Sequence, residues 1–233
     1  MSAEEKEKRR AKFMADVSHD MKTPLNAVIG FTSVLLQDRE DLGTEKTRQL
    51  KLVYKSAHRL LGRVDALTEF FRLQAGVIEA DVDWFSPRQL IEETLNLFRE
   101  EAKEKGIRLE IASGSMPSRM RSASRLLSRA LRELVANAVK FTNSGSVSVD
   151  LRIEEGQTAF RVADGGSGLS AGSLQTLKAA LGSRDTYDGL GLGLALSREV
   201  AHELGGRIKV ESQPDRGSIF TLVFELTRDD LEM

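Results

Sequence analysis

The 233-residue chain contains no cysteine, only four prolines, and few aromatic residues. The absence of cysteine excludes a disulfide framework and thiolate metal sites. It fits a reducing compartment, so we expect a cytoplasmic protein. No apolar run approaches the roughly 20 residues that a membrane helix requires. The N-terminus, MSAEEKEKRRAKF, is too highly charged for a signal peptide and resembles the end of a longer charged helix.

An excess of charge of either sign is also missing. The chain has 34 basic and 35 acidic residues, which gives a formal net charge of −1. Nucleic-acid binding therefore has no electrostatic support, and we expect no nucleic-acid partner.

Two long helices are expected in the first third of the chain. The first spans residues 3 to about 37, with apolar residues at helical spacing: Phe13, Val17, Met21, Leu25, Val28 and Ile29. The second spans about 45 to 75, and the polar stretch QDREDLGT between them is typical of a turn. A hairpin of two amphipathic helices cannot bury both apolar stripes by itself. We therefore expect residues 1–78 to pair with a second copy, as a homodimer with a four-helix bundle.

The composition changes near residue 78, and residues 79–233 are expected to form a second domain. Alternating apolar residues predict strands at 107–111, 147–153, 158–162, 207–211 and 218–226, and a strand or linker at 81–85. Helices are predicted at 86–106, 124–141, 170–181 and about 190–205. This mixture predicts an α/β sandwich, so the whole chain is expected to be a two-domain α+β protein.

His19 lies inside the first helix, in the stretch SHDMKTPLN. A neutral imidazole has a free lone pair and can act as a nucleophile. The neighbouring carboxylate of Asp20 can accept a hydrogen bond from the other ring nitrogen. Thr23 lies one turn later on nearly the same face, and Pro24 is expected to bend the helix. A lone histidine is more often an ordinary surface residue than a nucleophile. The motifs of the second domain are therefore needed to choose between these two interpretations.

The predicted helix 124–141 has two faces. The face expected to be buried carries Leu127, Leu131, Leu134 and Ala138, and another face carries Glu133, Asn137 and Lys140. An asparagine oxygen suits magnesium, which prefers hard oxygen ligands and takes many of them from phosphates and water. A lysine can meet a phosphate. Taken alone, such a face is usually just solvated.

Two glycine-rich stretches follow. In the first, Asp164 ends a strand and precedes Gly166 and Gly168, where a carboxylate can accept a hydrogen bond from an exocyclic amine and glycines let a planar base approach. The second, Gly189-Leu-Gly191-Leu-Gly193, leads into a helix, and exposed backbone N–H groups there suit a polyphosphate. Either stretch alone could be a tight turn. A dinucleotide-binding fold is disfavoured because no βαβ unit surrounds the glycines.

Five stretches in this order resemble the sensor histidine kinases of two-component systems: SHDMKTPLN, ELVANAVKFT, DGGSG, DGLGLGLAL and GSIFTLVFEL. The resemblance covers nearly the whole chain. It implies that residues 1–78 are a dimerisation and phosphoacceptor domain and that residues 79–233 are an ATP-binding domain like those of gyrase, Hsp90 and MutL. It also implies a kinase that phosphorylates itself from ATP with Mg²⁺, passes the phosphoryl group to an aspartate of a response regulator, and also dephosphorylates that regulator. A sensor or membrane domain could precede this segment in a longer protein.

The resemblance also implies roles for single residues. His19 would be the phosphoacceptor, Asp20 its activating acid, and Thr23 the residue that orients water during dephosphorylation of the regulator. Asn137 would hold Mg²⁺ and Lys140 would meet a phosphate. The other nucleotide-binding residues would be Asp164 for the adenine amine, Gly166 and Gly168 around it, Arg184 near the phosphates, and Gly189, Gly191 and Gly193 at the phosphate-binding lid.

The chain departs from the family pattern in two places. Glu133 stands where the family often has asparagine, and residues 169–188 are short and lack the usual aromatic motif. Three alternatives therefore stay open: a phosphatase-dominant protein, a degenerate kinase that serves as a dimeric receiver-binding scaffold, and a gyrase-type ATPase in which Glu133 activates water. The intact His19, Asn137 and Asp164 argue against the scaffold.

Overall fold

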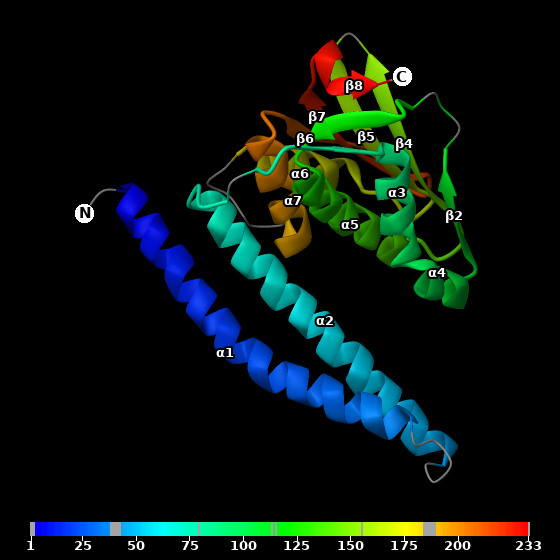
Figure 1. Ribbon diagram of the computed structural model, residues 1–233. Coiled ribbons are helices and arrows are strands. Elements are labelled where there is room, and N and C mark those ends of the chain that lie inside the picture. The colour runs from blue at the N-terminus through cyan, green and yellow to red at the C-terminus, as the bar shows by residue number, and fades with distance from the viewer. Residues whose placement is uncertain are drawn as a thin grey trace. The chain divides into compact units, whose positions relative to one another are not determined.

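The chain divides into two compact units, Met1–Ile78 and Glu79–Met233, in the computed structural model (Figure 1). The structure describes residues 3–37, 43–78, 80–112, 114, 116–154, 156–183 and 190–232. Most of the turn expected between the first two helices lies outside these residues.

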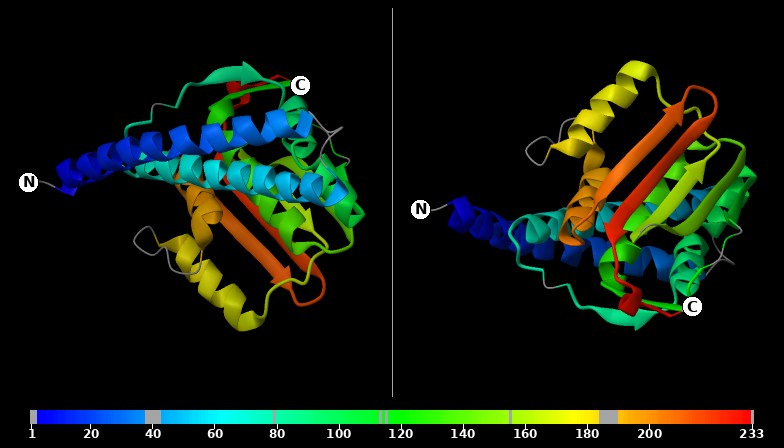
Figure 2. Two further views of the ribbon diagram at one scale, coloured as in Figure 1. Left: turned by 90° about the horizontal axis from the view of Figure 1, so that it is seen from below. Right: turned by 90° about the horizontal axis from the view of Figure 1, so that it is seen from above.

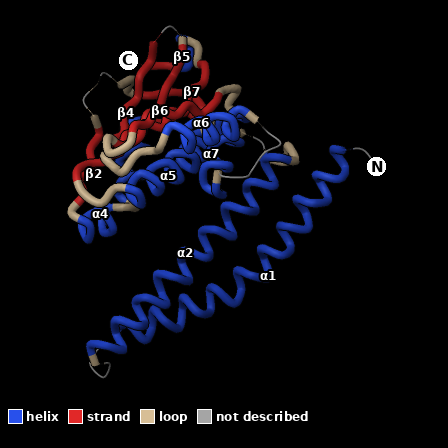
Figure 3. Tube along the Cα trace, turned by 180° about the vertical axis from the view of Figure 1, so that it is seen from behind, coloured by secondary structure: helices blue, strands red, loops and turns tan. Residues whose placement is uncertain are grey.

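The first unit is a hairpin of α1 (Ala3–Gln37) and α2 (Thr44–Gln74). Helix α1 runs unbroken through Pro24 and is visibly bent (Figure 3). The buried apolar residues of α2 are Ala57, Val64, Ala66, Phe70 and Leu73. Alanine lets the two helices approach closely, and the larger side chains fill the seam between them. None of the described helices combines the length and apolar character that spanning a membrane requires.

As expected for a single hairpin, part of the α1 stripe stays exposed within one chain. Phe13 is 64% exposed, and Val28 and Met21 are each 41% exposed. Phe31 at 74% and Leu52 at 67% extend the apolar surface over both helices. Periodicity identified the stripe correctly, but a two-helix hairpin has only one internal seam in which to bury it.

The second unit contains five α-helices and eight strands among its described residues. The helices are α3 (Pro87–Asn96), α4 (Arg99–Lys105), α5 (Ser124–Phe141), α6 (Ala171–Gly182) and α7 (Gly191–Glu203). The strands are β1 (Asp83–Phe85), β2 (Ile107–Ile111), β3 (Arg119–Ser122), β4 (Gly145–Glu154), β5 (Gln157–Asp164), β6 (Arg207–Gln213), β7 (Gly217–Glu225) and β8 (Leu231–Glu232).

The strands form two sheets. The larger has the order β2-β4-β5-β7-β6, with β2 and β4 parallel and the other neighbours antiparallel. The smaller sheet, β1-β3-β8, is antiparallel. Helices lie against one face of the larger sheet, and β6 and β7 are in front when the unit is seen from above (Figure 2, right). This arrangement confirms the expected α/β sandwich.

The core lies between the larger sheet and its helices. Its largest fully buried side chains include Phe160 of β5, Leu222 of β7, and Leu127, Leu131 and Leu134 of α5. The apolar face predicted for residues 124–141 is therefore confirmed. Burying such side chains stabilises a domain by about 1.5–3 kcal/mol each before entropy is counted, so this packing fixes the orientation of the opposite face of α5.

One prediction about this unit was wrong, and two of its strands were not predicted. The helix expected at 86–106 is broken between α3 and α4, and Leu97 at the break is 64% exposed. Strand β3 and the C-terminal strand β8 were not predicted. Only alternate residues of the sequence RMRS in β3 are buried, and its arginines hide the short apolar pattern.

Candidate functional site

The turn of α1 that carries His19 is open to solvent. The side chains of His19 and Asp20 are 83% and 87% exposed, and the His19 Nδ1 and Asp20 Oδ1 atoms are 3.7 Å apart. Thr23 is also exposed, and its hydroxyl donates a hydrogen bond to the His19 carbonyl oxygen at 3.3 Å. An exposed imidazole beside a carboxylate remains accessible to a second reactant from outside the hairpin.

Polar contacts hold this turn against α2. The Thr68 hydroxyl donates to the Ser18 hydroxyl at 2.5 Å, and Ser18 is buried directly beside His19 in sequence. One turn later, the Lys22 ammonium lies 2.7 Å from the Asp65 carboxylate. Polar pairs between two packed helices favour one register of α1 against α2. They therefore fix the position of His19 along the axis of α2.

Helix α5 presents the second group of candidate residues. Glu133 and Asn137 are half-buried, whereas Lys140 is exposed with its ammonium 4.8 Å from the centre of the Phe141 ring. The Arg129 guanidinium lies 3.2 Å from the Glu133 carboxylate. Burial raises the pKa of Glu133, and Arg129 opposes this rise.

Asp164 is the last residue of β5, as expected for a carboxylate at a strand end. The Gly166 N–H donates to its Oδ1 atom at 2.9 Å. Burial raises the pKa of the Asp164 carboxyl, while hydrogen bonds from the backbones of Gly166 and Ser218 oppose the rise. The carboxylate is thus held in place by backbone donors.

The glycines next to Asp164 are required by close packing. A Cβ atom on Gly166 would overlap the Phe141 carbonyl at the end of α5, and one on Gly168 would overlap the Gln213 carbonyl of β6. A Cβ on Gly217 would overlap the Asp164 carbonyl itself. Gly168 and Gly217 also have φ values of +62° and +86°, which L side chains adopt rarely.

The last glycine motif is closer to α5 than its sequence suggests. Gly191 and Gly193 lie in the first turn of α7, not in a loop before it, and Gly191 has a φ of +67°. A Cβ on Gly193 would overlap the Glu133 carboxylate. Arg184 and Gly189 lie outside the described residues.

These contacts join stretches that are distant in sequence. Helix α5 meets α7 at Glu133 and Gly193, and it meets the loop after β5 at Phe141 and Gly166. The turn between β6 and β7 meets that same loop through Gly168. Asn137 lies on α5 between the two contact points, so one edge of the sandwich gathers an amide, a carboxylate and glycine-rich backbone.

The residues at this edge are suited to a nucleotide more than to a metal held by protein alone. In the described part of the chain, no group of three or more histidine, aspartate, glutamate or cysteine side chains is placed to hold a metal ion. The Asn137 amide would therefore serve a magnesium ion whose other ligands are phosphates and water.

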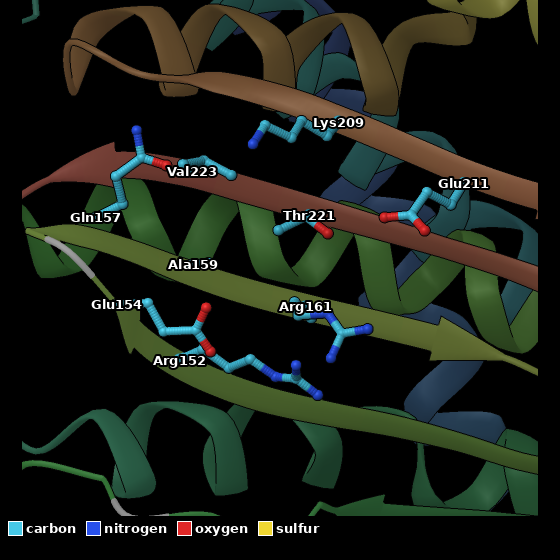
Figure 4. Close-up of a pocket in the computed structure, with 9 residues that line it drawn as sticks. All are labelled: Arg152, Glu154, Gln157, Ala159, Arg161, Lys209, Glu211, Thr221 and Val223. Carbon is cyan, nitrogen blue, oxygen red and sulfur yellow. The ribbon is translucent and has the colours of Figure 1, made fainter.

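A hollow on the other face of the larger sheet has different chemistry (Figure 4). It is lined by Arg152, Glu154, Gln157, Ala159, Arg161, Lys209, Glu211, Thr221 and Val223. Its charges are mixed, and the Arg161 guanidinium is paired with Asp150 at 3.2 Å. No candidate site residue lies in it, and it has no glycine-lined backbone for a nucleotide.

Comparison with known proteins places the two units in known families. Residues 9–76 match the His Kinase A (phospho-acceptor) domain. Residues 122–228 match the family of histidine kinase-, DNA gyrase B- and HSP90-like ATPases. By its two domains, the chain belongs to the sensor histidine kinases. The family inferred from the five sequence motifs is thereby confirmed.

Several sensor histidine kinases align with nearly the whole chain. Sensor histidine kinase GacS of Pseudomonas protegens is 32% identical over 96% of this chain but only 26% of its own length. Signal transduction histidine-protein kinase BarA of Escherichia coli is 29% identical over 94% of this chain and 25% of its own length. The chain thus spans about a quarter of the curated relatives it matches.

Two solved structures have a fold similar to that of this chain. Full-length ShkA in complex with AMPPNP matches with a TM-score of 0.71 and 28% identity, covering 91% of this chain and 45% of ShkA. The Acinetobacter baumannii histidine kinase AdeS matches with a TM-score of 0.60 over 90% of this chain and 98% of that chain. At 18% identity, the AdeS match concerns the fold alone.

Two residues near the site were missed by sequence analysis. Ser212 and Ser218 face each other on β6 and β7, with hydroxyl oxygens 2.9 Å apart, beside Asp164. The only signal in the sequence is a serine on each side of the turn QPDRG, which does not indicate a hydrogen-bonded pair.

Proposed function

We propose that this chain is a histidine kinase core that phosphorylates His19 from ATP and passes the phosphoryl group to an aspartate of a response regulator. The convergence of α5, the Asp164 loop and the first turn of α7 at one edge of the sandwich carries the proposal. It supports a nucleotide site in the second unit, while the exposed His19 turn supports an acceptor site in the first.

The nucleotide would be held by complementary groups on four stretches of the chain. The Asp164 carboxylate accepts a hydrogen bond from the adenine amine, and the close packing of Gly166 and Gly168 on the backbones of Phe141 and Gln213 fixes the loop that carries this carboxylate. The backbone of Gly191 and Gly193 faces the phosphates at the N-terminus of α7. Asn137 holds Mg²⁺ and Lys140 neutralises phosphate charge, with Arg184 and Gly189 as further candidates.

The transfer step requires positioning and charge neutralisation more than covalent chemistry. ATP supplies the γ-phosphoryl group, and a magnesium ion held by the Asn137 amide would neutralise charge on its phosphates. A ring nitrogen of His19 forms the new bond to phosphorus, and ADP takes the electron pair of the bond that breaks. Asp20 accepts a hydrogen bond from the other ring nitrogen and stabilises the positive charge that develops on the imidazole.

Dimerisation would complete the first unit. The exposed apolar residues of α1 and α2, including Phe13, Phe31 and Leu52, form a face that a second hairpin can cover. Two such hairpins make a four-helix bundle in which each apolar stripe is buried. Residues 1–78 are therefore proposed as the dimerisation and phosphoacceptor domain, and 79–233 as the ATP-binding domain.

Incubating the purified chain with magnesium and γ-labelled ATP tests the kinase proposal. We expect a protein-bound label that is lost in acid and kept in alkali, as a phosphorus–nitrogen bond requires. Asn137→Ala should lose both the label and the magnesium dependence of ATP binding. Tight ATP binding without any label would instead favour a phosphatase or a scaffold.

A substitution at Thr23 should separate phosphatase activity from kinase activity. Because its hydroxyl lies one turn from His19, Thr23→Ala should leave labelling of the chain intact and slow dephosphorylation of a phosphorylated receiver. Equal dephosphorylation by the wild type and the variant would count against this role.

Simple ATP hydrolysis is a second candidate activity, favoured by the position of Glu133. Its carboxylate meets the backbone of α7 at Gly193, and burial makes it more basic than an ordinary glutamate. Its pairing with Arg129 opposes the rise in its pKa. Phosphate release that stops in Glu133→Gln, while labelling of the chain continues, would establish hydrolysis as a separate activity.

A further inference from the structure

The loop that follows Asp164, residues 165–169, rests on the β6–β7 turn at three successive points. The Ser167 carbonyl accepts a hydrogen bond from the Asp215 N–H at 2.8 Å. Gly168 packs on the Gln213 carbonyl. The Leu169 N–H donates to the Ser212 hydroxyl at 2.8 Å. Of these three contacts, only the last depends on a side chain of the β6–β7 hairpin.

Ser212 uses the full hydrogen-bonding capacity of its hydroxyl group. A hydroxyl has one proton to donate and two lone pairs that accept. The Ser212 Oγ atom donates to the Gly217 carbonyl at 3.0 Å and accepts from the Leu169 N–H. Since its proton is committed to Gly217, the Ser218 hydroxyl at 2.9 Å must be the donor in the contact between the two serines.

The same serine also connects to Asp164. Ser212 pairs with Ser218 across β6 and β7, and Ser218 pairs with Asp164 across β7 and β5. Residues paired in this way lie on the same face of a sheet, so the three side chains stand in one row. The backbone of Ser218 in turn hydrogen-bonds to the Asp164 carboxylate. The Ser212 hydroxyl therefore contacts both Ser218, which neighbours the Asp164 carboxylate, and Leu169, at the end of the loop that follows Asp164.

We propose that Ser212 is a positioning residue for adenine recognition: its hydroxyl links the Leu169 end of the loop to Ser218 and so sets the position of the Asp164 carboxylate. This inference rests on the proposed ATP site. Ser212 touches neither the base nor the phosphates; it acts through Asp164.

Calorimetric titration of the full-length chain with ATP tests the proposal. Removing one hydroxyl that makes several partly buried hydrogen bonds should weaken ATP binding about tenfold in Ser212→Ala. Ser212→Thr keeps the hydroxyl and should restore the affinity to within about threefold of the wild type. Ser148→Ala, which removes a hydroxyl from β4 of the same sheet, is the matched control and should bind as the wild type does.

A second titrant distinguishes positioning from general destabilisation. Purine riboside triphosphate lacks the amine that Asp164 recognises, so its affinity should change little in Ser212→Ala and the preference for ATP should shrink. Equal weakening of both nucleotides, or an unchanged ATP affinity, would overturn the role of Ser212. If Ser212→Ala does not fold, Ser212→Cys, which keeps the volume but hydrogen-bonds weakly, takes its place with the same expected loss of preference.

The two proposals fail in different ways. A wild-type chain that binds no ATP would overturn the proposed function and this inference together. A wild-type chain that binds ATP and a Ser212 variant with the same preference would overturn only the inference.

Discussion

The glycines around Asp164 differ from those of the helical hairpin in the space around them. Gly30 and Gly62 of the hairpin have no neighbouring atom within 4 Å of the place where a Cβ would stand. Gly166, Gly168 and Gly217 would each drive a Cβ into neighbouring backbone or side-chain atoms. The nucleotide edge is therefore defined by close packing, whereas the His19 turn is defined by an exposed reactive group and its fixed height on the hairpin.

The difference indicates how the labour is divided between the units. A site that recognises a rigid base needs a preformed shape, and contacts between distant strands and helices would provide one at the proposed nucleotide site. The proposed phosphoacceptor would have to be reached by a nucleotide-bearing domain and by a receiver, so an exposed side chain would serve better than a buried one.

Gly217→Ala should give the largest effect on the nucleotide edge. The new Cβ would overlap the Asp164 carbonyl at a φ of +86°, so we expect ATP binding to be lost and the free energy of unfolding to fall by about 2–4 kcal/mol. Calorimetry and urea denaturation measure the two quantities.

Gly106→Ala is the control for backbone strain alone. Gly106 has a similar φ of +70° but open space around its Cβ position. The Gly106→Ala variant should lower the free energy of unfolding by only about 1–2 kcal/mol and leave the affinity for ATP unchanged. Equal losses of stability in Gly217→Ala and Gly106→Ala, with ATP binding retained in both, would contradict the distinction between closely packed glycines and glycines with open space at the Cβ position.

The pH dependence of ATP binding should sharpen the role of Asp164. The ionised carboxylate accepts a hydrogen bond from an amine more strongly than the protonated carboxyl group does, and burial raises the pKa of Asp164. ATP affinity should therefore decline on acidification before an ordinary aspartate, with a pKa of about 3.9, would titrate. Asp164→Asn should bind ATP about 10- to 100-fold more weakly and lose this pH dependence. An unchanged acid limb in the variant would contradict the assignment.

The contribution of Asp164 to stability has the opposite sign. A carboxyl whose pKa is raised on folding binds its proton more tightly in the folded state. The contribution of Asp164 to the free energy of unfolding is therefore most favourable at a pH below its pKa in the unfolded chain. This contribution is lost as the pH rises through its higher pKa in the folded protein. Urea denaturation at pH values between the unfolded and folded pKa of Asp164 should show a free energy of unfolding that falls with rising pH in the wild type. Asp164→Asn should lack this pH dependence.

Gly62→Ala should give the smallest effect. Gly62 is exposed in the middle of α2, and alanine has the higher helix propensity. The variant should gain about 0.5–1 kcal/mol in the free energy of unfolding and bind ATP as before. Destabilisation would mean that this surface is covered in the dimer more closely than the single chain indicates.

Local pattern was enough to predict much of this structure. The hairpin, the buried face of α5 and the strand that ends at Asp164 all follow from apolar periodicity. The start of α3 follows from its capping residues Ser86 and Pro87. The candidate residues His19, Asn137 and Asp164 were found because their motifs occur in one order along the chain.

What local pattern could not give were contacts between distant segments. The meeting of Glu133 with Gly193, and of Gly168 with Gln213, depends on how α7 and β6 return to the sheet. The break after α3 was missed because Leu97 and Phe98 continue an apolar pattern across it. The exposure of part of the α1 stripe was expected of a lone hairpin, but periodicity records only which residues are apolar and not which chain covers them.

The measurement that tests the account most directly is to locate the phosphoryl group on the protein. The chain has three histidines, so His58→Ala and His202→Ala serve as matched controls for His19→Ala. After incubation with magnesium and ATP, mass spectrometry at neutral pH should find the phosphoryl group on His19 in the wild type and in both controls, and none in His19→Ala. Undiminished phosphorylation of His19→Ala at another residue would contradict the account.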